Sequence, residues 1–375
     1  MPRKKPRKVR ISLRKNRQKR PRIRDVTRDA RGEEPNAVDL PSAERISGKG
    51  DLTRQRTIVA AEDDSGAGVL RAVDESNCRS GRVLSAAGLN CIVSDSAGHR
   101  YECTVRRVVR TMSRVERGAV IAGDTVLFKP VDHQHGVIER VNPRRTTLAR
   151  GTRRKEQVIA ANIDQVLIVA SAADPPLKTN FVDRLLISAH KGGVKPLLCV
   201  NKSDLIDPVR LQPILGMYAQ LGYEVILTSA ATSTGIEELK RLLRARETVI
   251  AGQSGVGKSS LLNAVQPNLR LETDMVSDWT RKGRHTTRTA VLHELDFGGW
   301  VVDTPGIRQM QLWDVRPEEV EGFFVEFRPF VPRCRFPDCS HTHETGCAIK
   351  QAVDHDLVSP VRYASYLKIM SDEPV

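Results

Sequence analysis

The sequence of 375 residues has no apolar run long enough to cross a bilayer, and no apolar stretch follows its basic N-terminus. A membrane-spanning segment and a secretory signal peptide are therefore not expected, and we predict a cytoplasmic protein with no membrane partner. Aromatic residues are scarce at 4%, but an apolar share of 39% is adequate for globular domains. A chain of this length is expected to divide into two or three domains.

Acidic residues are missing from residues 1–24, which hold 13 lysines and arginines. The rest of the chain carries 47 basic and 45 acidic residues, so nearly all of the net charge of +15 lies in this segment. We predict a disordered basic arm over residues 1–50 that contacts the phosphate backbone of nucleic acid, with a solubilising tail as the alternative. Residues 51–79 are predicted to be a linker.

Five short alternating runs, separated by turn residues, follow the linker. They cover residues 82–84, 90–93, 101–105, 124–128 and 136–141. Five short strands in about sixty residues are typical of a small β-barrel, and an OB-fold that binds RNA, over residues 80–148, is the natural candidate. Arginines crowd the connection 106–117, for which RNA contact and a solvated loop both remain open.

Strand-like and helical patterns alternate in the next part of the chain. Near-continuous apolar runs are typical of parallel strands that are buried on both faces, and segments with helical spacing lie between them. The runs cover 165–170, 196–200, 224–228 and 248–251, and the helical segments cover 180–190 and 235–246. The sequence therefore predicts a doubly wound α/β domain, which we place at residues 149–313.

The clearest motif, G-x-x-x-x-G-K-[ST], lies between a predicted strand and a predicted helix. The predicted contacts are Gly252, Gln253, Ser254, Gly255, Val256, Gly257, Lys258 and Ser259, followed by Ser260. In this context backbone N–H groups surround a β-phosphate, and the helix N-terminus adds its positive end. Lys258 is expected to reach the β- and γ-phosphates, and Ser259 to bind Mg²⁺. A glycine turn with only a structural role is the alternative.

Two polar segments follow predicted strands, at the edge where open α/β sheets bind ligands. They are Asn201, Lys202, Ser203 and Asp204 in the first segment, and Ser229 and Ala230 in the second. The Asp204 carboxylate can accept from N1–H and the exocyclic amine of guanine, a donor pair that adenine lacks. Asn201 is predicted to bond the purine edge, the Lys202 stem to lie over the ring, and a backbone N–H of the second segment to donate to guanine O6. The ligand is therefore predicted to be GTP or GDP.

Switch threonines and a D-x-x-G sequence follow the phosphate loop. Asp303 ends a predicted strand, where a carboxylate can hold an Mg²⁺-bound water, and the Gly306 N–H can meet the γ-phosphate. Thr286 or Thr287 is predicted to complete the Mg²⁺ shell when γ-phosphate is present. A polar loop is the alternative for the threonines.

The residue that orients the attacking water is not in its usual place. Ile307 follows Gly306, and an aliphatic side chain cannot orient water. His285, on the predicted switch loop, is the nearest candidate to position or deprotonate water. A structural switch histidine is the alternative.

Seven cysteines without an extracellular signal indicate reduced thiols or a metal site rather than disulfides. The candidate metal ligands are Cys334, Cys339, His341 and Cys347, with His343 as a competing ligand. Three sulfurs and one imidazole suit a closed tetrahedral zinc site without an open position for catalysis. The sequence thus predicts one structural Zn²⁺ per chain, in a small helical domain over residues 314–375.

The order of the motifs is unusual, because the base-reading segment precedes the phosphate loop. The helical segment that ends near residue 246 runs almost directly into the strand at 248–251. This connection joins the two ends that an unpermuted GTPase domain would have. Since the termini of compact domains often lie close together, such a circular permutation is sterically simple.

With G-R-H-T-T at residues 283–287, D-T-P-G at 303–306 and the cysteine cluster, residues 80–370 resemble the circularly permuted, small-ribosomal-subunit-dependent GTPase A family. The resemblance implies an OB-fold, a permuted GTPase domain and a zinc domain. It also implies late maturation or quality checking of the small ribosomal subunit, with ribosomal RNA stimulating hydrolysis. Among the ligands it favours His341 over His343, and it supports His285 as the catalytic residue.

We therefore expect a GTP hydrolase, converting GTP and water to GDP and phosphate with Mg²⁺. It is expected to act as a monomeric late-stage assembly factor that binds the small ribosomal subunit and its ribosomal RNA. One alternative is a GTP-switched RNA-binding module in which hydrolysis is incidental. Another is a permuted GTPase that acts on a different RNA.

Overall fold

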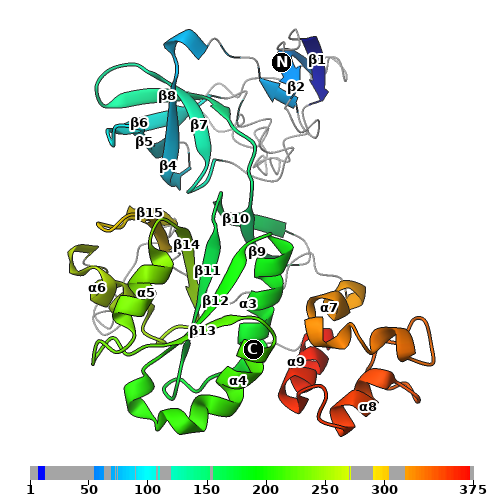
Figure 1. Ribbon diagram of the computed structural model, residues 1–375. Coiled ribbons are helices and arrows are strands. Elements are labelled where there is room, and N and C mark those ends of the chain that lie inside the picture. The colour runs from blue at the N-terminus through cyan, green and yellow to red at the C-terminus, as the bar shows by residue number, and fades with distance from the viewer. Residues whose placement is uncertain are drawn as a thin grey trace, which may run out of the picture. The chain divides into compact units, whose positions relative to one another are not determined.

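A computed structural model of the chain, shown in Figure 1, places most residues beyond position 74. The residues that it describes are 7–12, 55–62, 69–71, 73, 75–88, 90–106, 109, 120–152, 155–269, 271, 290–303 and 317–371. They belong to two compact units, Met1–Val73 and Asp74–Val375. No helix in these ranges is long and apolar enough to span a bilayer.

The first unit contains a small antiparallel sheet of three strands, β1 (Arg7–Ser12), β2 (Gln55–Glu62) and β3 (Val69–Arg71). The structure differs here from the sequence analysis, which predicts no strand in the arm or the linker. Val9 of β1 is paired with Ile58 of β2 across the sheet. The apolar runs of these strands are short and far apart in the sequence, so neither one indicates a strand by itself.

Five strands at the predicted positions close into a barrel in the second unit. They are β4 (Arg79–Ala87), β5 (Asn90–Asp95), β6 (Arg100–Val105), β7 (Thr125–Pro130) and β8 (His135–Val141). Their order is β4-β5-β6-β8-β7, and pairing of β4 with β7 completes the ring. Alternate side chains such as Val83, Val93, Phe128 and Ile138 fill its interior. This five-stranded closure is that of an OB-fold, as predicted.

A hairpin of β9 (Thr147–Thr152) and β10 (Lys155–Ala161) leads from the barrel to the α/β domain. The predicted domain boundary at residue 148 falls inside β9. The chain around this hairpin forms hydrogen bonds both to the barrel and to the α/β domain. Asn162 Nδ2, just after β10, donates to the Gly123 carbonyl of the barrel at 3.0 Å. The Thr147 N–H donates to the carbonyl of Gly192 in the α/β domain at 3.4 Å.

The α/β domain has five parallel strands and one antiparallel strand, which also pairs with β4 of the barrel. They are β11 (Gln165–Ser171), β12 (Lys195–Asn201), β13 (Glu224–Leu227), β14 (Glu247–Gly252) and β16 (Trp300–Asp303), with β15 (Val291–Glu294) antiparallel to β16. Their order is β13-β12-β11-β14-β16-β15. Every residue of β11 is buried, which agrees with the apolar run over residues 166–170.

Helices cover both faces of this sheet, as Figure 1 shows. On one face, α3 (Thr179–Lys191) and α4 (Gln212–Gln220) pack on Ile168. On the other, α5 (Ile236–Leu243) and α6 (Lys258–Val265) form a separate core with Leu167. Successive residues of one strand therefore belong to opposite layers, which confirms the predicted doubly wound fold.

The C-terminal domain contains α7 (Pro317–Phe323), α8 (Ala348–Asp354) and α9 (Pro360–Met370). Its aromatic core includes Phe324 and Tyr366, whose ring centroids are 5.3 Å apart. Arg362 of α9 is only 2% exposed and pairs with Asp183 of α3 and with Glu326. Its guanidinium carbon also lies 4.3 Å from the Phe324 ring centroid. A buried charge network thus fastens this domain to the α/β domain.

Substituting Arg362→Ala is expected to lower the free energy of unfolding by about 3–5 kcal/mol, because it leaves two buried carboxylates without their cation. Urea unfolding curves of the full chain measure the change. Lys368→Ala, at an exposed position of the same helix, is the control and should change stability by less than about 0.5 kcal/mol. Equal stabilities of the two variants would show that the network contributes nothing.

Candidate nucleotide and metal sites

The phosphate-binding motif connects β14 to α6, the strand–loop–helix context that the motif requires. Gly255 and Gly257 have φ of +81° and +89°, a left-handed conformation that side chains disfavour. A β-carbon on Gly257 would also lie 2.5 Å from Asn201 Nδ2. Lys258 Nζ donates to the carbonyls of Gly252 at 3.1 Å and Gln253 at 2.6 Å, so the ammonium lies across the loop.

Asn201 ends β12 and joins the base-reading segment to the phosphate loop. Its Nδ2 donates to the Val256 carbonyl at 2.9 Å, and its Oδ1 accepts from Thr228 Oγ1 at 3.3 Å. The residue is 1% exposed. The structure thus gives this amide a protein partner at each end, and the predicted contact with the purine edge stays a prediction. Asn201 therefore fixes the position of the loop relative to the adjacent strand ends.

The remaining base-reading residues meet at the carboxyl ends of β12 and β13. Ser229 Oγ donates to Asp204 Oδ1 at 2.5 Å, which orients the carboxylate. Lys202 has a left-handed backbone, with φ of 59°, and its Nζ donates to the Asp174 carbonyl at 2.5 Å. Ser203 lies beside Asp204 and donates its N–H to the Thr228 carbonyl at 3.1 Å.

The backbone amides of Ser229 and Ala230 differ in their availability to a base. The Ser229 N–H donates to the Thr234 carbonyl at 3.0 Å. That bond occupies the donor, so Ala230 is the better candidate for a contact with a purine carbonyl.

The Mg²⁺ and hydrolysis residues are only partly described. Ser259 lies in the first turn of α6, and Asp303 is the last residue of β16, which is paired in parallel with β14. The predicted Mg²⁺ ligands thus come from neighbouring elements at one sheet edge. His285, Thr286, Thr287 and Gly306 lie outside the described residues, and their roles stay predictions.

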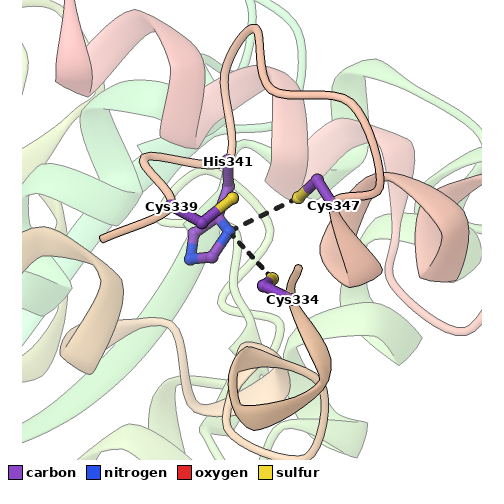
Figure 2. A group of neighbouring side chains, drawn as sticks. All are labelled: Cys334, Cys339, His341 and Cys347. Atoms are coloured by element: carbon purple, nitrogen blue, oxygen red, sulfur yellow. Dashed lines mark hydrogen bonds between the residues drawn. The ribbon is translucent and has the colours of Figure 1, made fainter. Parts of the chain in front are cut away.

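The predicted metal ligands come together in the C-terminal domain, as Figure 2 shows. The candidate ligand atoms of Cys334, Cys339, His341 and Cys347 all lie within 4.8 Å of one another. Nδ1 of His341 is 3.5 Å from the sulfur of Cys334 and 3.4 Å from that of Cys347. The competing ligand His343 has a side chain that is 84% exposed and is not part of this group.

Neighbouring groups hold this cluster in a form that suits a cation. His341 Nε2 lies 2.9 Å from Glu321 Oε2, so the carboxylate can bind the ring proton and leave Nδ1 as the ligand atom. Burial, together with the nearby Cys347 and Cys334, raises the pKa of Cys339 to about 12. A buried thiol that resists ionisation, beside two further cysteines, fits a site in which a bound cation compensates the thiolate charges. The cluster can therefore hold a metal ion.

Known proteins are similar to this chain in sequence and in fold. A family model described as RsgA GTPase matches residues 141–313. Curated relatives carry the name "Small ribosomal subunit biogenesis GTPase RsgA". The relative from Sodalis glossinidius is 36% identical over 77% of this chain and 84% of its own length. The relative from Chlorobaculum tepidum is 40% identical over 78% of this chain and 97% of its own length. The chain belongs to the RsgA GTPase family.

Solved structures agree with this family assignment. YjeQ from Thermotoga maritima is 35% identical with a TM-score of 0.64, over 79% of this chain and 98% of that one. The circularly permuted GTPase YloQ is 28% identical with a TM-score of 0.61, and the match covers 80% of this chain and 97% of YloQ. The permuted order predicted for this RsgA-family chain is thereby confirmed.

Sequence reasoning assigned no role to two residues that complete these sites. Thr228 links the Asn201 amide to β13, and Glu321 supports the metal ligand His341 from α7. The only signal for Thr228 is its place at the end of a predicted strand. Glu321 lies outside the cysteine pattern, so no motif connects it with the cluster.

Replacing Gly257 with alanine is expected to weaken binding of a fluorescent GTP analogue by about tenfold or more. Alanine disfavours the left-handed φ at this position, and its methyl group would collide with the Asn201 amide, so the loop must move. Gly216→Ala is the matched control, since Gly216 lies in α4 with no atom within 4 Å of the added carbon. Unchanged affinity of the Gly257 variant would contradict the tight fit between the loop and Asn201.

Proposed function

We propose that this protein hydrolyses GTP and acts in biogenesis of the small ribosomal subunit, the role stated in the names of its curated relatives. The observation that supports this most directly is the contact of Asn201 with Val256, which brings the base-reading segment and the phosphate loop to one site. Phosphate binding and base selection are thus built into one edge of the sheet.

Guanine selection rests on Asp204. Ser229 occupies one carboxylate oxygen, and the other can accept from N1–H and the exocyclic amine of guanine. The Ala230 N–H then donates to O6, and the Lys202 stem covers the ring. Adenine offers the wrong pattern of donors and acceptors to this pair, so ATP would leave the Asp204 carboxylate without a donor from the base.

Hydrolysis relies on groups around the γ-phosphate. Ser259, Asp303 and either Thr286 or Thr287 would hold Mg²⁺, which neutralises charge on the β- and γ-phosphates when bound. On GTP binding, the Lys258 ammonium would donate to phosphate oxygens in place of the carbonyls of Gly252 and Gln253. The Gly306 N–H contacts the γ-phosphate, and the remaining phosphate contacts come from residues 252–260. His285 orients the attacking water.

The cysteine cluster is proposed to bind one structural Zn²⁺. Three thiolates and one imidazole are the ligands of a closed tetrahedral site, and Glu321 fixes the imidazole as zinc sites commonly require. The ion would hold the loop between η8 (Val331–Arg333) and α8. Its role is to stabilise the C-terminal domain.

The expected partners are the small ribosomal subunit and its ribosomal RNA, which the barrel, the C-terminal domain and the basic arm would contact. We propose that the protein acts in the cytoplasm as a monomer, without a membrane partner. Capture of small subunits by the tagged protein with a non-hydrolysable GTP analogue tests the partner. Single-turnover hydrolysis with and without small subunits separates this function from an RNA-binding module with incidental turnover.

Asp204→Asn is expected to lose affinity for GTP and to gain affinity for the xanthine nucleotide. The asparagine amide can donate to the carbonyl that xanthine carries where guanine has its exocyclic amine. Competition between the two nucleotides for the protein measures the change. Asp207→Asn is the matched control, since the exposed Asp207 side chain accepts from the Val209 N–H at 3.0 Å at the start of a short helix. A GTP preference that persists in the Asp204 variant would refute the assignment of the base site.

His285→Ala is expected to bind GTP normally and to slow small-subunit-stimulated hydrolysis by roughly 10²-fold or more, the usual scale for loss of a general base. Stimulated kcat and nucleotide affinity are measured on the same preparation. His343→Ala, at an exposed position outside the metal cluster, serves as the histidine control. A normal stimulated kcat would leave His285 with a structural role only.

A further inference from the structure

Phe336 lies in the loop between the metal ligands Cys334 and Cys339, and its side chain is exposed. All eight phenylalanines of the chain are described, and Phe336 is the one whose side chain is exposed, at 41%. The two cysteines anchor this loop on both sides of the ring. An aromatic ring is thus held at the surface by a rigid support.

Arg335 is arranged beside this ring. Its guanidinium carbon lies 5.6 Å from the Phe336 ring centroid. Its aliphatic stem crosses Gly346, where an added β-carbon would lie 3.3 Å from both Cβ and Cδ of Arg335. The Arg335 N–H also donates to the Gly346 carbonyl at 3.2 Å. The absence of a side chain at Gly346 therefore gives the arginine its path to the aromatic ring.

The charge around Phe336 is opposite to that of its domain. Residues 317–371 hold six basic and eight acidic residues, whereas residues 328–337 hold three arginines and no acidic residue. Arg333 and Arg335 are exposed, and no carboxylate among the described residues forms an ion pair with either one. This local positive charge suits a polyanion.

We propose that Phe336, Arg335 and Arg333 form a binding site for single-stranded RNA. An unpaired base stacks on the Phe336 ring, and the two guanidiniums bind flanking phosphates. A single exposed ring is enough for base stacking, whereas a stable protein interface needs a contiguous surface of much greater area. The inference rests on the proposed function in ribosomal subunit biogenesis and names the RNA element that the C-terminal domain contacts.

The test uses the full-length, metal-loaded protein and a single-stranded RNA of about ten nucleotides with 2-aminopurine at its centre. Wild-type protein should quench the 2-aminopurine fluorescence by stacking. Phe336→Ala should lose the quenching and weaken binding by about five- to 150-fold, the range for loss of one base–aromatic stack. Phe336→Tyr should retain both. Leu357→Ala, at a residue that is 64% exposed in the same domain, is the matched control and should behave as wild type.

Each other outcome has a defined meaning. Quenching and affinity that survive in Phe336→Ala would overturn the site, as would a wild-type protein that binds small subunits but no single-stranded RNA. Metal content and unfolding midpoint, measured on every variant, show whether Phe336→Ala is folded, and Phe336→Leu repeats the test if it is not. Absence of small-subunit stimulation in wild type would instead contradict the proposed function, so the two failures are distinguishable.

Discussion

The parallel pairing of β14 with β11 on one side and β16 on the other determines where the predicted phosphate loop lies. Parallel strands end at a common edge, so the last residue of β14, Gly252, opens the phosphate loop beside the ends of β11 and β16. The Asn201 amide then spans β11 to reach the Val256 carbonyl. Because the strands are buried on both faces, displacing β14 would disturb two cores at once.

The C-terminal domain is connected to this edge both along the chain and through space. Thirteen residues separate Asp303 from the start of α7 at Pro317. α7 carries Glu321, which contacts the predicted metal ligand His341. Through Arg362 and Asp183 the same domain is fixed to α3. The chain that follows the D-x-x-G sequence is therefore anchored to the metal cluster at its far end, so the nucleotide site and the proposed RNA surface share one support.

Local patterns in the sequence were sufficient for the elements that have strong periodicity or a motif. The five barrel strands, the buried run of β11 and the grouping of the three cysteines were predicted correctly from spacing, whereas the choice of His341 over His343 came from the family resemblance. The use of Asn201 as a loop anchor could not be predicted, because its partner Val256 is far away in sequence and a backbone carbonyl carries no sequence signature. The pairing of Arg362 with Asp183 likewise depends on how two domains pack, and the strands of the first unit depend on pairing between short, distant runs.

The permuted order also affects how the chain is completed during its own synthesis. Asp183 of α3 leaves the translating ribosome early, whereas its partner Arg362 is made 179 residues later. Until β14 emerges, the nascent α/β domain lacks a central strand and the phosphate loop, so nucleotide cannot stabilise it. Non-local pairings of this kind form slowly, because the long intervening chain must first be closed. The contact between Arg362 on α9 and Asp183 can therefore form only long after α3 has been made.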